Sequence, residues 1–183
     1  SLRRKLELEA VQGQKNGGKY IRPIVLFQAQ PKNNVDSTTY EKIKHTLMEM
    51  GIPESEIAIK TADKDELKNI DLSSSDCNIR YIITVNALKE GWDCPFAYIL
   101  ATVANRTSSI DVEQILGRIL RLPNTKKNES EVLNLSYVIT SSNAFYGTLD
   151  KVVAGLNAAG FTSKDYRVDD CEDVVDEQQT TQE

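Results

Sequence analysis

Short runs of consecutive hydrophobic residues recur along the chain, separated by polar segments. The run IVLF, at residues 24–27, is typical, because no polar residue interrupts its apolar side chains. A strand of this kind must bury both of its faces, so we expect an α/β fold in which a parallel sheet is covered by helices on both sides. The runs predict strands at residues 21–29, 57–60, 79–85, 98–103 and 132–139.

Helical periodicity appears between these runs. In residues 38–50 the apolar residues Ile43, Leu47 and Met50 repeat at i, i+4 and i+7, and Thr38 and Glu41 have the spacing of a capping box. Further helices are predicted at residues 64–69, 110–120 and 144–159, and a charged amphipathic stretch at residues 2–11. We therefore divide the chain into a linker helix and loop at 1–20, one α/β lobe at 21–162, and an acidic tail at 163–183 that we expect to be disordered.

Composition narrows the class of protein. A chain of 183 residues with 40% hydrophobic residues is long enough for one domain with a sizeable core. Its three cysteines form no CxxC pair, which excludes zinc-ribbon and disulfide scaffolds and indicates a reducing, cytoplasmic location. The apolar runs are too short to span a membrane. The chain starts with serine and has no early methionine, so we expect a fragment of a longer protein.

The net charge of -5 is unevenly distributed. Residues 165–183 carry eight acids against Arg167 alone, so the rest of the chain carries about +2. A nucleic-acid partner for the lobe therefore stays possible.

The predicted helix at residues 110–120 has two different faces. Four apolar residues share the face that we expect to pack on the sheet, namely Val112, Ile115, Leu116 and Ile119. The opposite face carries Gln114, Gly117, Arg118 and Arg121. Two guanidinium groups one turn apart suit phosphate oxygens, and a glycine between them lets a ligand approach the backbone. The alternative interpretation is that both arginines are ordinary solvated surface residues.

Two segments resemble motifs of superfamily 2 helicases and translocases. The string QILGRILR at residues 114–121 resembles motif VI of that superfamily, and KEGWD at residues 89–93 resembles its motif V. The longer strings LKEGWDCP and EQILGRILRLP are similar to the Res subunit of type III restriction endonucleases. This resemblance covers residues 21–159 and implies the second of the two RecA-like lobes of such a motor.

The resemblance implies a nucleotide site shared with a first lobe. Arg118 and Arg121 match arginine fingers, which stabilise the charge that develops on a transferring γ-phosphoryl group. Gln114 would help to position the nucleotide or the attacking water. Nucleotide-binding roles fall on Gly91, Asp93 and Gly117, and the alternative for Asp93 is a helix or turn cap.

The implied cofactors, ATP and Mg²⁺, would be bound mainly by the first lobe. No GxxxxGK(S/T) loop is present, and the string GGKY at residues 17–20 is interpreted as a flexible loop. We therefore expect no ATP hydrolysis by this chain alone. No metal site is predicted, and a single histidine, His45, leaves no Ser-His-Asp arrangement.

The implied partners are double-stranded DNA, the N-terminal RecA-like lobe of the same parent chain and a methyltransferase subunit, without a membrane. Contacts to the sugar-phosphate backbone are expected where strands end, at Gln28, Gln30, Thr61, Thr84 and Asn86. For each of these residues a solvated loop is the alternative. Two other functions remain open, a lobe of another superfamily 2 helicase that acts on RNA, and a noncatalytic α/β interaction module whose arginine face binds an acidic partner.

Overall fold

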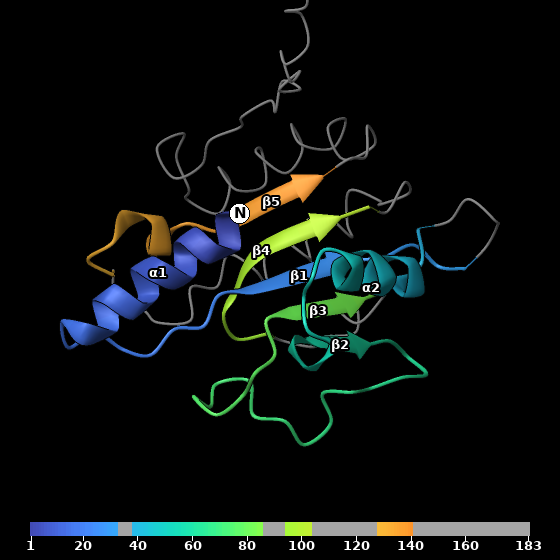
Figure 1. Cartoon of the computed structure of the whole chain (residues 1–183), viewed down its shortest axis with the longest axis horizontal. Coiled ribbons are helices and arrows are strands. Elements are labelled where there is room, and N and C mark those ends of the chain that lie inside the picture. The colour runs from blue at the N-terminus through green and yellow to red at the C-terminus, as the bar shows by residue number, and fades with distance from the viewer. Residues whose placement is uncertain (33–37, 86–93, 104–127, 141–183) are drawn as a thin grey trace, which may run out of the picture.

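The computed structural model describes residues 1–32, 38–85, 94–103 and 128–140 of the chain (Figure 1). Its helices are α1 (Leu2–Lys15) and α2 (Tyr40–Glu49), with short 3₁₀ helices at Glu54–Glu56 and Glu131–Asn134. Its strands are β1 (Ile24–Gln28), β2 (Ile57–Lys60), β3 (Tyr81–Thr84), β4 (Ala97–Thr102) and β5 (Tyr137–Thr140). Each of these strands overlaps one of the predicted apolar runs.

The five strands form one sheet in the order β2-β3-β1-β4-β5, and every pairing in it is parallel. At the centre of the sheet Leu26 of β1 lies opposite Ile82 of β3 and Leu100 of β4. Because the strands are parallel, their carboxyl ends meet at one edge, to which the arrowheads point in Figure 1. The predicted α/β fold with a parallel sheet is confirmed.

Both faces of the central strands are buried, as the continuous apolar runs predict. In β1 the side chain of Leu26 is fully buried, and Val25, which points to the opposite face of the sheet, is buried as well. Helix α2 lies across β1 and β3 in Figure 1 and buries its Ile43 and Leu47 in a cluster with Ile83. These two residues are the i and i+4 positions of the predicted periodicity, so the apolar stripe of α2 faces the sheet.

Helix α1 packs against the same lobe. Its Leu6 and Ala10 are buried in the main cluster of the sheet, and its polar side chains reach β3, where Arg3 Nε donates to the Tyr81 hydroxyl at 3.0 Å. Arg80, just before β3, donates through Nε to a Glu7 carboxylate oxygen at 3.1 Å. The amphipathic stretch expected at residues 2–11 is therefore a longer helix that is fixed to the amino end of β3.

Both helices end in Schellman motifs. After α1, Gly17 has φ +88°, its amide donates to the Gln14 carbonyl, and the Gly18 amide donates to the Gly13 carbonyl. After α2, Gly51 has φ +83° and donates to the Met48 carbonyl in the same pattern. Glycine adopts this left-handed conformation without steric strain, which explains why each helix stops there.

The prediction of a helix at residues 64–69 is wrong, because this segment forms turns after β2. Its backbone donors are used outside a helix, since the Glu66 amide donates to the Ile59 carbonyl at 3.0 Å and the Leu67 amide donates to the Asp65 carboxylate at 3.0 Å. Asn69 adopts φ +65°, which a helix does not allow.

The predicted start of the last strand, at residue 132, is also wrong, because β5 begins at Tyr137. The preceding residues form the 3₁₀ helix, in which Leu133 is buried in the main cluster. The Asn134 side chain closes this turn by donating to the Asn128 carbonyl at 2.9 Å. This local hydrogen bond from the Asn134 side chain stabilises a turn where the sequence pattern predicts the start of a strand.

The helices predicted at residues 110–120 and 144–159 lie outside the described residues, as does the acidic tail. Neither described helix is long and apolar enough to cross a membrane.

Candidate functional site

The described residues among the predicted site residues lie at or after the carboxyl ends of β1, β2 and β3. β1 and β4 are neighbours there, but the chain leaves β1 toward β2 at one side of the sheet and leaves β4 toward β5 at the other. Ligands of open α/β sheets bind in the crevice outside such a switch point. The topology therefore selects the ends of β1 and β4, with β3 beside them, as the candidate site.

Gln28 and Thr84, two predicted nucleic-acid contacts, are buried at this edge. Gln28 is 4% exposed and Thr84 is fully buried. The Oε1 of Gln28 accepts a hydrogen bond from the Thr102 hydroxyl at 2.9 Å, and the Thr84 carbonyl accepts from the Ala29 amide at 2.7 Å. These groups join the ends of β1, β3 and β4, so neither side chain faces solvent in the lobe.

Gln30, two residues beyond β1, is half-buried and bridges two other segments. Its Nε2 donates to the Val103 carbonyl at 2.7 Å, and its Oε1 accepts from the Thr38 amide at 2.8 Å. The sequence pattern indicates Gln30 as a site residue but not these two hydrogen-bond partners. Thr38 appeared there only as a helix cap. In the structure Thr39 is the N-cap, with its side chain accepting from the Lys42 amide.

Thr61, after β2, lies in a tight turn. Its amide donates to the Lys64 carbonyl at 2.7 Å, and its hydroxyl oxygen accepts from the Lys64 amide at 3.0 Å. Thr61 is half-buried. Among the four described candidates for nucleic-acid contacts, it is the one that lies in an exposed turn and not at the end of a central strand.

The other predicted site residues fall outside the described residues. They are Asn86, Gly91, Asp93, Gln114, Gly117, Arg118 and Arg121. Their position in the chain is nevertheless informative, because residues 86–93 follow β3 after one residue and residues 104–127 follow β4 after one residue. Both segments therefore start from the carboxyl edge.

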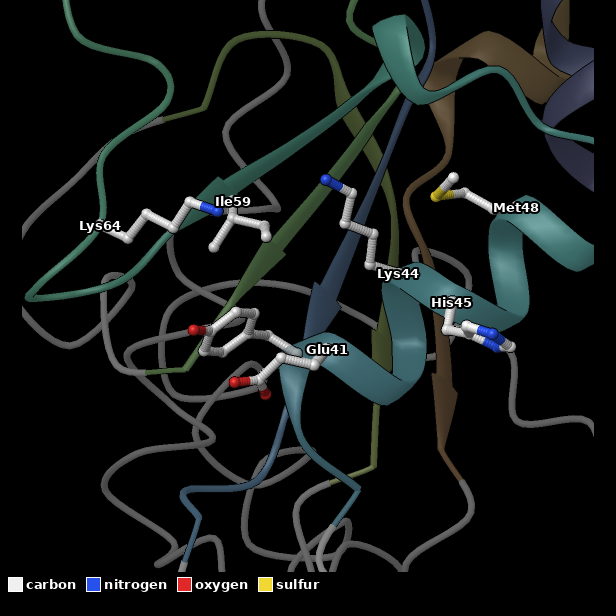
Figure 2. Close-up of a pocket in the computed structure, with 7 residues that line it drawn as sticks. Glu41, Lys44, His45, Met48, Ile59 and Lys64 are labelled. Atoms are coloured by element: carbon white, nitrogen blue, oxygen red, sulfur yellow. The ribbon is translucent and has the colours of Figure 1, made fainter.

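A shallow cavity of about 320 Å³ lies between α2 and β2 (Figure 2). It is lined by Tyr40, Glu41, Lys44, His45, Met48, Ile59 and Lys64. Figure 2 shows that Lys44, His45 and Met48 come from α2, whereas Ile59 and Lys64 come from β2 and the turn after it.

The charges around this cavity are balanced by ion pairs. Lys44 pairs with Glu54 at 2.5 Å, and Lys64 pairs with Glu66 at 2.9 Å. A hydrogen bond to Glu41 raises the pKa of Tyr40, and hydrogen bonds, first among them one from the Thr39 side chain, lower the pKa of Glu41. The cavity thus presents no excess of positive charge, which a binding site for a phosphate chain needs.

No family model matches the sequence, and no curated protein matches it. The chain is similar to the C-terminal domain of Dbp5 from S. cerevisiae, solved as a variant bound to Gle1 and IP6, at 14% identity and a TM-score of 0.47, over 83% of this chain and 79% of that chain. It is also similar to the ATP-dependent Type ISP restriction-modification enzyme LlaBIII bound to DNA, at 17% identity and a TM-score of 0.42, over 81% of this chain. The chain spans 11% of the length of that enzyme.

Proposed function

We propose that the chain is the second motor lobe of an ATP-dependent DNA translocase of the type III restriction kind. The observation that carries this proposal is the order of two motifs relative to a parallel sheet. The KEGWD segment follows the carboxyl end of β3, and the QILGRILR segment follows the carboxyl end of β4. Because both strands point the same way, the chain passes the edge where ligands of such sheets bind before it reaches each motif.

In this proposal Arg118 and Arg121 act across the cleft between two lobes. Closure of the cleft brings their guanidinium groups to the oxygens on which negative charge develops during phosphoryl transfer. Gln114 orients the nucleotide or the water, while Gly91 and Gly117 allow close approach of the backbone. Asp93 accepts a hydrogen bond from a hydroxyl group or an arginine.

The phosphate-binding loop and the Mg²⁺ ligands would come from the first lobe. The glycine pair of this chain does not fit a phosphate, because the amides of Gly17 and Gly18 are already bonded to carbonyls of α1. A side chain at Gly18 would also meet the Gly13 carbonyl oxygen, since an added Cβ would lie 2.7 Å from it. The chain would therefore contribute to ATP hydrolysis only as part of a larger subunit.

DNA would bind at the same carboxyl edge, mainly through its sugar-phosphate backbone. Thr61, in its turn after β2, and Asn86, next to the end of β3, are the proposed direct contacts. Gln28 and Thr84 would contribute by fixing the strand ends from which these contacts are made, since their side chains are buried. Reopening of the cleft after hydrolysis would advance the DNA, and a methyltransferase subunit would complete the enzyme.

The test is the substitution Arg118→Ala in the complete motor, with Arg4→Ala as a matched control. Arg4 is an exposed arginine on α1 whose side chain is 66% exposed, and among the described residues it forms one ion pair, with Glu7. We expect Arg118→Ala to lower ATP turnover by about 10³-fold or more while ATP binding persists, because an arginine finger acts in the transition state. Arg4→Ala should leave turnover unchanged.

Normal turnover in Arg118→Ala, together with a weakened protein complex, would instead support an interaction module. The class of nucleic acid is tested separately by comparing stimulation of ATP turnover by double-stranded DNA and by RNA. Stimulation by RNA alone would contradict the restriction assignment and favour an RNA helicase lobe.

A further inference from the structure

β2 is the outermost described strand on one side of the sheet, and its other side pairs with β3 (Figure 1). The free side of an outer strand normally carries unpaired N–H groups, which can pair with a strand of another molecule. In β2 the amides of alternate residues are instead bonded to local oxygen atoms, in the pairs Ile57–Glu54, Ile59–Glu66 and Thr61–Lys64. The free edge of β2 is therefore closed by the chain itself.

Glu66 closes the middle of this edge through two groups. Its Oε2 accepts from the Ile59 amide at 2.8 Å, and its own amide donates to the Ile59 carbonyl at 3.0 Å. Next to this contact, Lys60 and Asp65 form an antiparallel bridge, and their side chains form an ion pair. Residues 61–66 thus fold back along β2 as a strap that covers both backbone groups of Ile59.

The carboxylate of Glu66 is held in its ionised form. Lys64 Nζ lies 2.9 Å from Glu66 Oε1, and the Glu66 side chain is 33% exposed. Burial alone would raise the pKa of Glu66, but hydrogen bonds from Lys64 and from the Ile59 amide outweigh it and hold the pKa below its ordinary value of 4.5. An ionised oxygen is a stronger acceptor than a backbone carbonyl, so the Ile59 amide gains little by leaving Glu66 for another strand.

We propose that Glu66 closes the edge of β2 against pairing with a second copy of this chain. Ile59 offers one donor and one acceptor on the same edge, so the edge is complementary to itself. Two copies related by a two-fold axis would place their β2 strands antiparallel, and each Ile59 amide would donate to the Ile59 carbonyl of the other copy. These are the same two groups that Glu66 occupies. The inference does not depend on the proposed function, because β3 separates β2 from the ends of β1 and β4.

Three substitutions of Glu66 remove the contacts in steps. Glu66→Gln keeps an oxygen that accepts from the Ile59 amide and loses the charge. Glu66→Ala loses the carboxylate but keeps the backbone amide. Glu66→Pro loses both groups, because proline has no N–H. Glu54→Ala is the matched control, because it removes an acid near the same strand whose side chain pairs with Lys44 of α2 instead.

The experiment follows the mass of the whole chain by sedimentation over a range of protein concentrations. Hydrogen exchange reports on the Ile59 amide, and circular dichroism gives the folded fraction. We expect Glu66→Gln and Glu54→Ala to sediment as wild type. Glu66→Pro should approach about twice the wild-type mass as its concentration rises, and Glu66→Ala should do so at higher concentrations.

Hydrogen exchange identifies the surface that associates. At low concentration the Ile59 amide should exchange about tenfold faster in Glu66→Ala than in wild type, because its hydrogen bond is lost. As either variant associates, this amide should become protected again, since it then donates to the second copy.

Several results would overturn the proposal. A wild-type mass in both Glu66→Ala and Glu66→Pro would do so, whatever the exchange rate. Association that leaves the Ile59 amide unprotected would show that another surface is responsible. Equal association in Glu66→Gln or Glu54→Ala would indicate an effect of the lost charge. If Glu66→Pro is unfolded, Glu66→Ala decides the question by the same criteria, and association that follows its unfolded fraction counts against the proposal.

Discussion

Arg22 is a buried cation whose hydrogen-bond acceptors are all uncharged. It precedes β1 and is 2% exposed. Its Nε donates to the Ile79 carbonyl at 2.9 Å, its Nη1 to the Ser74 carbonyl at 2.7 Å and to the Tyr20 hydroxyl at 3.0 Å, and its Nη2 to the Leu72 carbonyl. Three of these acceptors belong to the connection between β2 and β3, which has no helix. We infer that Arg22 holds this connection in place.

The cost of removing the guanidinium group can be worked from these contacts. Arg22→Met leaves three carbonyls without their donor, and a buried acceptor without a partner costs about 1–3 kcal/mol. The sum overstates the loss, because much of residues 71–79 is exposed and water can replace some of the bonds. Methionine also avoids the desolvation cost of a buried cation. We expect a net loss of about 3 kcal/mol in the free energy of unfolding.

Arg22→Lys tests whether the planar group matters. It keeps the charge but cannot direct donors at three carbonyls at once, so we expect a loss of about 2 kcal/mol. Urea denaturation measures these values, and for a chain of this length about 3 kcal/mol corresponds to a Tm lower by about 6–12 °C. The control Arg4→Met removes an exposed arginine and should cost about 0–1 kcal/mol. A loss below about 1 kcal/mol in Arg22→Met would refute the reasoning.

Three further substitutions test other contacts. Burial alone would raise the pKa of Glu7, but hydrogen bonds from Arg3 and Arg80 outweigh it and hold the pKa below its ordinary value of 4.5. The stability that Glu7 contributes is therefore complete above that pH and is lost as the pH falls below it. Glu7→Gln should make the acid side of the stability curve flatter in urea denaturation, and an unchanged slope would contradict this. Gly51→Ala places a side chain at φ +83° and should cost about 1–2 kcal/mol, whereas Gly13→Ala, in the interior of α1, should not destabilise. Thr102→Val removes the hydroxyl that donates to Gln28 and should cost about 1–3 kcal/mol, and equal stability would show that this buried bond contributes nothing.

The sequence predicts the sheet well because each strand is a local apolar run. It predicts the end of α2 equally well, because Gly51 supplies a backbone conformation that other residues avoid. The start of α2 is predicted one residue too early, because Thr38 and Thr39 are adjacent threonines and either can cap a helix, whereas the structure has Thr39 as the N-cap. Gln30 decides between them, because it occupies the amide and the carbonyl of Thr38. That contact spans eight residues and cannot be read from the local pattern.

The candidate site shows the same limit. The rule that polar residues at strand ends share one edge leads to Gln28, Thr84 and Gln30, which lie at or just after the ends of β1 and β3 in the structure. It does not reveal that Thr102 lies opposite Gln28 in the register of β1 and β4 and occupies its side chain. Whether a polar residue at a strand end faces a ligand or a neighbouring strand depends on register, which is a non-local property.

The proposed role of this lobe is to supply arginine side chains to ATP hydrolysis in a larger motor. A single-turnover measurement tests it most directly, because it follows hydrolysis of ATP that is already bound and excludes effects on binding or product release. We compare the complete motor carrying Arg118→Ala with the complete motor carrying Arg121→Ala. Both variants should bind ATP with wild-type affinity, and at least one of them should hydrolyse bound ATP about 10³-fold more slowly than wild type. A rate within about threefold of wild type in both variants would contradict the account.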